Sequence, residues 1–232
     1  MERPRRIAIY GGTFDPVHRG HLEIARRISE LFDIDEFLFV PARVAPHKLN
    51  REVSAAFHRY AMLALATKDE ANVRVSTVEI DGPGTRYTVD TLAHFRREFG
   101  ESAEIFFVLG ADSWAEIASW REWRRLTTLA TLIVVTRPGY EISSDHVDAE
   151  TAALIQDLRG RANEQIRKST RTAGAKIFFS DAVMADVSAT EIREASGRND
   201  LEELGKLVTP EVAEYIRKYQ LYRNRHEATY NG

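Results

Sequence analysis

Residues 6–32, "RIAIYGGTFDPVHRGHLEIARRISELF", decide the fold class of this chain. The segment begins with a short apolar run, residues 6–10, of the kind found in buried strands. Gly11 and Gly12 then permit a close turn, and Asp15-Pro16 makes a second corner. A helix comes next, because apolar residues recur at helical spacing at Leu22, Ala25, Ile28, Leu31 and Phe32. The segment therefore predicts a strand, a glycine turn and a helix.

The same alternation continues along the chain. Further runs rich in β-branched and aromatic residues predict strands at residues 36–40, 73–80, 104–110, 131–136 and 176–180. Helical spacing recurs at Phe57, Tyr60, Leu63 and Ala64. Strand and helix in alternation predict an α/β fold: a doubly wound parallel sheet with helices on both faces and right-handed crossovers.

The C-terminal part has a different pattern. Residues 140–175 are polar and charged, which predicts an exposed helical excursion and not a second core. Thr209 as a cap and Pro210 in the first turn predict a helix over residues 209–222 that packs back on the body. We expect a single domain over residues 1–223, of which residues 187–223 form the C-terminal helices. Residues 224–232 are expected to be a disordered tail.

Composition limits the classes of function. With 232 residues, 44% of them hydrophobic, the chain is long enough to bury a full core. Its 32 basic and 35 acidic residues give a net charge of -3, which argues against nucleic acid or an acidic membrane as a partner. The absence of cysteine excludes disulfides, and the N-terminal apolar run is too short for a signal peptide. We expect a soluble cytoplasmic protein, and the composition leaves a homo-oligomer open.

In a doubly wound sheet, ligands bind beyond the carboxyl ends of the strands. The first such loop holds His18 and His21, three residues apart. A zinc site would need a third ligand, the dinucleotide fingerprint a third glycine, and the P-loop a Gly-Lys-Ser/Thr ending. The loop lacks the third glycine and the Gly-Lys-Ser/Thr ending, and no third metal ligand near it is unmistakable. A metal site is therefore the less favoured alternative, beside chance spacing and a cradle for a reacting phosphate at a helix N-terminus.

Five blocks of sequence together resemble a known family. "GGTFDPVHRGH" (11–21) resembles the motif of the HxGH nucleotidyltransferase superfamily. The other blocks are "PARVAPHK" (41–48), "GPGTRYTVDTL" (82–92), "LGADSW" (109–114) with Trp120, and "VSATEIR" (187–193). In this order they resemble the nicotinate mononucleotide adenylyltransferases. The resemblance implies a Rossmann-like nucleotidyltransferase fold, and transfer of the adenylyl group of ATP to nicotinate mononucleotide in NAD biosynthesis.

The resemblance also implies roles for residues on the ATP side. It assigns contacts with the transferring and leaving phosphates to His18, His21, Lys48 and Arg193. It places ATP against Gly11, Gly12, Thr13, Phe14, Gly110, Asp112, Ser188 and Thr190. Mg²⁺ is expected to bind mainly through the ATP phosphates, with few protein ligands.

On the acceptor side, the resemblance assigns main-chain N–H groups of Tyr87 and Thr88 to the nicotinate carboxylate. Trp120 is expected to stack on the pyridine ring, with Trp114 and Trp123 as rivals. Arg121 is a candidate for a second, charged contact with the carboxylate.

Some of these residues also have purely structural explanations. Asp112 is a candidate helix cap, and Ser188 with Glu191 has the spacing of a capping box. Two other functions remain open. One is a related nucleotidyltransferase with another acceptor, such as nicotinamide mononucleotide, phosphopantetheine or glycerol phosphate. The other is a non-catalytic nucleotide-binding regulator or RNA-binding module on the same fold.

Overall fold

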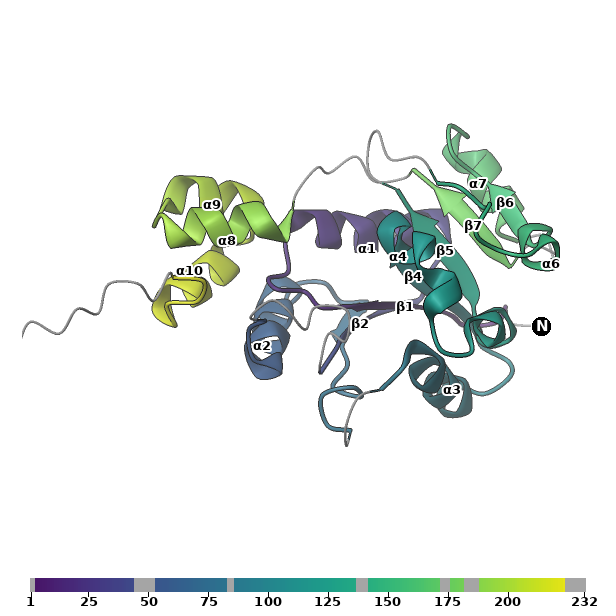
Figure 1. The fold of residues 1–232 in the computed structure, drawn as a ribbon, viewed down its shortest axis with the longest axis horizontal. Coiled ribbons are helices and arrows are strands. Elements are labelled where there is room, and N and C mark those ends of the chain that lie inside the picture. The colour runs from purple at the N-terminus through teal and green to yellow at the C-terminus, as the bar shows by residue number, and fades with distance from the viewer. Residues whose placement is uncertain are drawn as a thin grey trace, which may run out of the picture.

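The computed structural model describes residues 3–43, 53–82, 86–136, 142–171, 176–181 and 188–223. These residues form one seven-stranded sheet flanked by helices (Figure 1). The strands are β1 (Arg6–Gly12), β2 (Glu36–Pro41), β3 (Val73–Val75), β4 (Glu104–Gly110), β5 (Thr131–Val135), β6 (Ile155–Asp157) and β7 (Ile177–Ser180). Their order is β3-β2-β1-β4-β5-β7-β6, and all neighbours pair in parallel. The predicted doubly wound parallel sheet is confirmed.

The helices alternate with these strands. The longer ones are α1 (Arg19–Leu31), α2 (Ala56–Ala66), α3 (Thr88–Phe99), α7 (Asn163–Ser169), α8 (Ala189–Gly197), α9 (Leu201–Leu207) and α10 (Pro210–Lys218). The short ones are α4 (Ala111–Ala115), α5 (Leu126–Leu129) and α6 (Ala149–Ala152), with 3₁₀ turns η2 (Ile117–Ser119) and η3 (Trp123–Arg125). Figure 1 shows α8, α9 and α10 grouped at one end of the molecule, beside α2.

The sheet separates two apolar cores. Successive residues of a strand point to opposite faces. On β1, Ala8 and Tyr10 therefore join the core under α1, α2, α7 and the C-terminal helices. Ile7 and Ile9 join the core under α3, α4 and α5. Both faces of the central strands are buried, which explains why these strands are continuous apolar runs.

The direction of the chain reverses beside β1. From β1 the chain first adds β2 and β3 on one side, and then returns to add β4 and β5 on the other. The crossovers leave β1 and β4 in opposite directions, so a crevice opens beyond the carboxyl ends of these two strands. Gly12 and Gly110 end them.

Strand β3 is shorter than predicted. The expected run covered residues 73–80, but the ladder ends where the N–H of Ser76 donates to the carbonyl of Phe39 at 2.8 Å. The chain then turns, and the N–H of Ile80 donates to the carbonyl of Thr77 at 2.8 Å. The apolar residues in the second half of the expected run therefore lie in a turn and not in a strand.

The prediction for residues 140–175 missed a strand. β6 lies in this region and pairs with β7 at the edge of the sheet. Leu158 and Ile166 are buried in the same core as α1. The region is therefore not only an exposed helical excursion, because it also closes one edge of the sheet. Residues 137–141 and 172–175 lie outside the described residues, as does the expected tail at 224–232.

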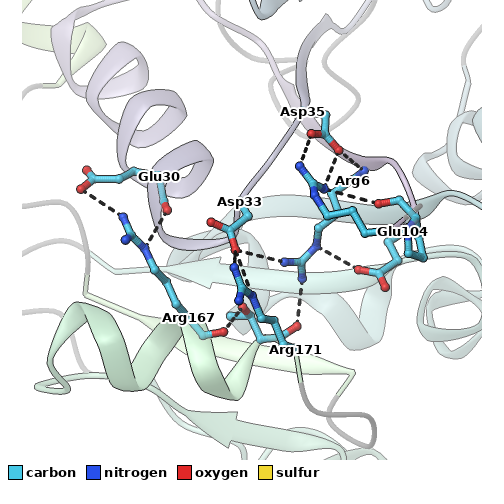
Figure 2. Close-up of polar contacts among 10 residues, drawn as sticks. Arg6, Glu30, Asp33, Asp35, Glu104, Arg167 and Arg171 are labelled. Carbon is cyan, nitrogen blue, oxygen red and sulfur yellow. Dashed lines mark hydrogen bonds and ion pairs between the residues drawn. The ribbon is translucent and has the colours of Figure 1, made fainter. Parts of the chain in front are cut away.

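Ion pairs fasten this region to the start of the sheet (Figure 2). Arg6 is 5% exposed, and its guanidinium lies 2.9 Å from the Glu104 carboxylate and donates to the Thr170 carbonyl at 2.9 Å. Arg171 pairs with Asp33 at 2.6 Å. Burial lowers the pKa of Arg6, and the neighbouring carboxylates oppose that effect. These contacts lie at the amino ends of β1 and β4, opposite the crevice.

The start of the last helix agrees with the prediction, but α10 ends at Lys218 and does not continue to residue 222. The Thr209 side chain accepts from the N–H of Val212, and Pro210 occupies the first turn of α10. Val212 and Ile216 are buried against the body, and α10 packs on α2. Among the described residues, no helix combines the length and apolar character needed to cross a bilayer.

Candidate active site

Two glycines end the strands that flank the crevice. A Cβ at Gly12 would lie 2.9 Å from the ring of Phe14, and a Cβ at Gly110 would lie 2.5 Å from Oδ1 of Asp112. In both places a neighbouring side chain folds back over the glycine, so any larger residue would displace it. The two strand ends at the switch point therefore have no room for a side chain of their own, and Phe14 and Asp112 lie directly against them.

Helix α1 begins with two stacked imidazoles. His18 is the N-cap, and His21 is the third residue of the first turn. Their ring centroids lie 3.7 Å apart, with 31° between the ring planes. The main-chain N–H of His18 donates to Nδ1 of His21 at 3.2 Å, so His21 takes the place of the Glu or Gln in a capping box. Since Nδ1 accepts, the neutral His21 ring carries its proton on Nε2.

Aromatic rings hold His21 in place. The ring centroid of Phe14 lies 5.0 Å from that of His21 at an interplanar angle of 77°, and the Tyr10 centroid lies at 5.9 Å. Phe14 itself is 3% exposed, and its backbone is left-handed with φ 50°. The Phe14 side chain thus supports the histidine pair from the core, and any contact of this residue with ATP would come from its main chain.

The N-terminus of α8 reaches the same loop. The Ser188 side chain accepts from the N–H of Glu191 at 3.2 Å, and the Glu191 carboxylate accepts from the N–H of Ser188 at 3.1 Å. The capping box expected here is therefore present. Arg193 donates to the carbonyl of Asp15 at 2.7 Å and to the Thr190 hydroxyl at 2.9 Å. The structure thus brings Arg193 to the loop that carries the two histidines.

This arrangement creates a positive region without a large net charge. The N–H groups of the first turns of α1 and α8 point out of the helix N-termini, and the helix dipoles add positive potential there. The guanidinium of Arg193 adds a full charge beside the loop between β1 and α1. Such a region can hold the oxygens of a polyphosphate.

The predicted acceptor residues also lie together. Tyr87 is the N-cap of α3 and Thr88 its first residue. The guanidinium of Arg121 lies 4.9 Å from the centroid of the Tyr87 ring. The N–H of Tyr87 donates to the Asp90 carboxylate at 3.4 Å, a long bond that an acceptor carboxylate would have to replace. The cation of Arg121 therefore stands beside the N-terminus of α3.

The three tryptophans of the region differ in their environment. Trp114 is 1% exposed, and its indole N–H donates to the Ser143 carbonyl at 2.8 Å, which makes it a core residue. Trp120 is half-buried, with its ring 6.5 Å from that of Phe107 on β4. Trp123 is half-buried too, and the Arg124 guanidinium lies 4.5 Å from the centroid of its ring. Trp120 and Trp123 both pack against the core under α3, and Trp120 is the one whose ring contacts a central strand.

Sequence reasoning missed Arg59. This arginine is 1% exposed, and its guanidinium donates to the carbonyls of Thr13 (2.7 Å), Ala42 (2.6 Å) and Ser54 (2.9 Å). It thereby joins the loop after β1 to the loop after β2. Burial lowers the pKa of Arg59, and Asp15 opposes that effect. Its position inside an otherwise ordinary amphipathic helix gave no sign of this role.

One predicted site residue cannot be placed. Lys48, assigned to the leaving phosphates, lies in residues 44–52, outside the described part of the chain. The described residues contain no group of three or more His, Cys, Asp or Glu side chains that could hold a metal ion.

Comparison with known proteins gives consistent results. The family model described as cytidylyltransferase-like matches residues 9–195. A protein of Thermoanaerobacter sp. (strain X514) named "Probable nicotinate-nucleotide adenylyltransferase" is 36% identical over 98% of this chain and 99% of its own length. A protein of Chromobacterium violaceum with the same name is 36% identical over 94% of this chain and 99% of its own length.

The fold also matches a solved structure. It is the Plasmodium falciparum nicotinic acid mononucleotide adenylyltransferase complexed with NaAD, with a TM-score of 0.69. The alignment covers 94% of this chain and 97% of that one, at 22% sequence identity. The likeness therefore shows a shared fold and nothing more specific.

Proposed function

We propose roles in catalysis for residues of this chain, which belongs to the cytidylyltransferase-like family and, within it, to the nicotinate-nucleotide adenylyltransferases. The reaction transfers the adenylyl group of ATP to nicotinate mononucleotide, giving deamido-NAD and pyrophosphate. The observation that carries the proposal is the stacked pair of His18 and His21 at the N-terminus of α1, with Arg193 held on the same loop.

The reaction requires no side-chain nucleophile. The 5′-phosphate of nicotinate mononucleotide is already an anion, and one of its oxygens attacks the α-phosphorus of ATP in line. A new P–O bond forms, the bond from the α-phosphorus to the bridging oxygen breaks, and pyrophosphate leaves with that electron pair. The protein must hold two negatively charged reactants together and stabilise the charge on the equatorial and leaving oxygens.

His18 and His21 donate to the α- and β-phosphoryl oxygens. The bond from the His18 N–H to Nδ1 of His21 places the His21 proton on Nε2, which makes this nitrogen the donor. The dipole of α1 acts in the same direction. Arg193, with Lys48, neutralises the leaving pyrophosphate, and Arg193 is aimed by its bond to the Asp15 carbonyl.

The remaining ATP contacts come from the edge of the sheet and from α8. Gly11, Gly12 and Thr13 offer main chain to the nucleotide, and Asp112 beside Gly110 accepts from a ribose hydroxyl. Ser188 and Thr190 at the start of α8 hold the distal phosphates. Mg²⁺ enters as part of the MgATP substrate, bound through phosphate oxygens.

The acceptor binds across the crevice, beside α3. Trp120 stacks on the pyridine ring, and the Thr88 N–H with the Arg121 guanidinium reads the nicotinate carboxylate. The position of Arg121 over the Tyr87 ring supports this role, because it brings a positive charge to the N-terminus of α3. An uncharged nicotinamide would gain less from that charge. A cytoplasmic location is part of the same proposal.

The test is a panel of acceptors. Pyrophosphate release from MgATP is measured with nicotinate mononucleotide, nicotinamide mononucleotide, phosphopantetheine and glycerol phosphate side by side. We expect the highest kcat/KM with nicotinate mononucleotide. Higher activity with another acceptor would overturn the acceptor assignment, and no release with any of them would overturn catalysis in favour of a binding protein.

A further inference from the structure

The segment after α10 returns to the loop that carries the histidines. The carbonyl of Leu221 accepts from the Ser196 hydroxyl at 2.9 Å, which ties this segment to α8. Tyr222 comes next, with a left-handed backbone, φ 65°. Such a conformation is costly for tyrosine and persists only where surrounding contacts fix it. The Tyr222 hydroxyl donates to Oδ1 of Asp15 at 2.7 Å, across 207 positions of sequence.

Asp15 is the point where three distant segments meet. The residue is 6% exposed. Its Oδ2 accepts from the N–H of Ser54 at 3.2 Å, and its carbonyl accepts from Arg193 at 2.7 Å. A buried carboxylate must receive hydrogen bonds, so these donors fix the position of Asp15. The pKa of Tyr222 is raised, first by burial and then by the Asp15 carboxylate, so the phenol remains a donor.

The position of Asp15 affects two groups of the proposed active site. His18 lies three residues later in the same loop, and the Asp15 carbonyl orients the guanidinium of Arg193. A shift of the Asp15 main chain would move both groups that meet the phosphates in the proposed reaction. A displacement of about 1 Å in such a site lowers turnover strongly.

We propose that Tyr222 is a positioning residue for adenylyl transfer, which holds the Asp15 carboxylate and thereby fixes the loop that presents His18 and Arg193. This inference rests on the proposed function. It makes the segment after α10 part of the active-site architecture, because the Tyr222 hydroxyl acts on the histidine loop through its bond to Asp15.

The experiment compares two tyrosine substitutions in the full chain. Tyr222→Phe removes only the hydroxyl that donates to Asp15. Tyr219→Phe makes the same chemical change three residues earlier, where the ring is 49% exposed and contacts the rings of His58 and Tyr215. We expect Tyr222→Phe to lower kcat about tenfold, as for loss of a hydrogen bond to a charged group. The KM for nicotinate mononucleotide should stay within about twofold, since the acceptor residues lie elsewhere. Tyr219→Phe should retain the kcat of the parent protein.

A second measurement is independent of the substrate. Amide hydrogen exchange in the peptide that covers residues 13–18 should be faster in Tyr222→Phe and unchanged in Tyr219→Phe. An unchanged kcat in Tyr222→Phe, an equal loss in Tyr219→Phe, unchanged exchange, or global unfolding of Tyr222→Phe would each overturn the inference. An inactive parent protein would instead overturn the proposed function, and the exchange comparison would still decide whether Tyr222 fixes the loop.

Discussion

The main-chain N–H of His18 donates to Nδ1 of His21 at 3.2 Å, so the backbone at one histidine of the motif sets the tautomer of the other. The spacing of the two residues serves both structure and chemistry. The N-cap and the third position of the first turn meet across a capping box, which brings the rings to 3.7 Å and leaves Nε2 of His21 as the donor. A helix N-terminus and an imidazole donor then act on the same anion.

Substitution of His21 should separate its two roles. His21→Ala removes the donor and should lower kcat on the order of a hundredfold or more, with little change in the KM for ATP. His21→Glu restores an acceptor for the His18 N–H, as in an ordinary capping box, but offers no donor, so it should recover thermal stability without turnover. His94→Ala, on the exposed side of α3, serves as the control with parental activity. A loss confined to ATP affinity would make His21 a ground-state binder.

Gly12 should not tolerate a methyl group. In Gly12→Ala the new Cβ would lie 2.9 Å from the Phe14 ring, so Phe14 and the packed His21 must move. Overpacking of this kind costs about 1 to 3 kcal/mol. We expect a lower Tm together with a lower kcat. In Gly205→Ala, within α9, a Cβ meets no atom within 4 Å, and this variant should gain up to about 1 kcal/mol. Equal stability of the two variants would contradict the role of Gly12.

Trp120 should determine acceptor affinity. Trp120→Ala removes a stacking surface worth about 1 to 3 kcal/mol, so the KM for nicotinate mononucleotide should rise about tenfold or more while the KM for ATP stays constant. Trp123→Ala removes a neighbouring indole that carries Arg124 and should have little effect on either KM. Steady-state kinetics with each substrate varied in turn measures both. A rise in acceptor KM in Trp123→Ala alone would transfer the role to that residue.

Glu79 should make stability depend on pH. Burial raises the pKa of Glu79 above its ordinary value of 4.5, against the bond from the Thr91 hydroxyl and the nearby Arg86 and Arg59. The folded state therefore favours the protonated form, and this contribution to stability is full below pH 4.5 and lost as the pH rises through the folded pKa.

Glu79→Gln keeps an acceptor for Thr91, which donates at 2.7 Å, and removes the buried charge. Its Tm should exceed that of the parent protein at pH 8, with each kcal/mol gained appearing as about 2 to 4 °C, and the difference should vanish near pH 4. The exposed Glu98→Gln should show no such gain. A lower Tm for Glu79→Gln at pH 8 would mean that attraction to the arginines outweighs burial.

The sequence predicted the elements that have strong local signals. The apolar run located β1, and Thr209 with Pro210 located the start of α10. The turn expected at Gly11 and Gly12 was wrong, because both glycines pair with β2 and the strand ends only at Gly12. β6 was not predicted, because it has only three residues and pairs on one side only. It forms a strand because it pairs with β7, and its own sequence pattern gives no strand signal. β3 was overestimated because residues 77–80 are apolar in part but turn away from the ladder.

The site was predictable to the extent that motifs mark it. The blocks located the histidines, the α8 N-terminus and the acceptor residues, while their roles toward ligands stay predictions. The supporting bonds were not predictable, because Arg59 and Tyr222 act on main chain and carboxylate far away in sequence. Asp15 was interpreted only as a turn residue, although its carboxylate and carbonyl receive bonds from three segments.

The most direct test of the central claim is a crystal structure of the protein with a non-hydrolysable ATP analogue and Mg²⁺. We predict α- or β-phosphoryl oxygens within hydrogen-bond distance, about 2.7 to 3.2 Å, of the imidazole nitrogens of His18 and His21, with the γ-phosphate toward Arg193. A triphosphate bound well away from both histidines, or a zinc ion coordinated between them, would contradict this claim.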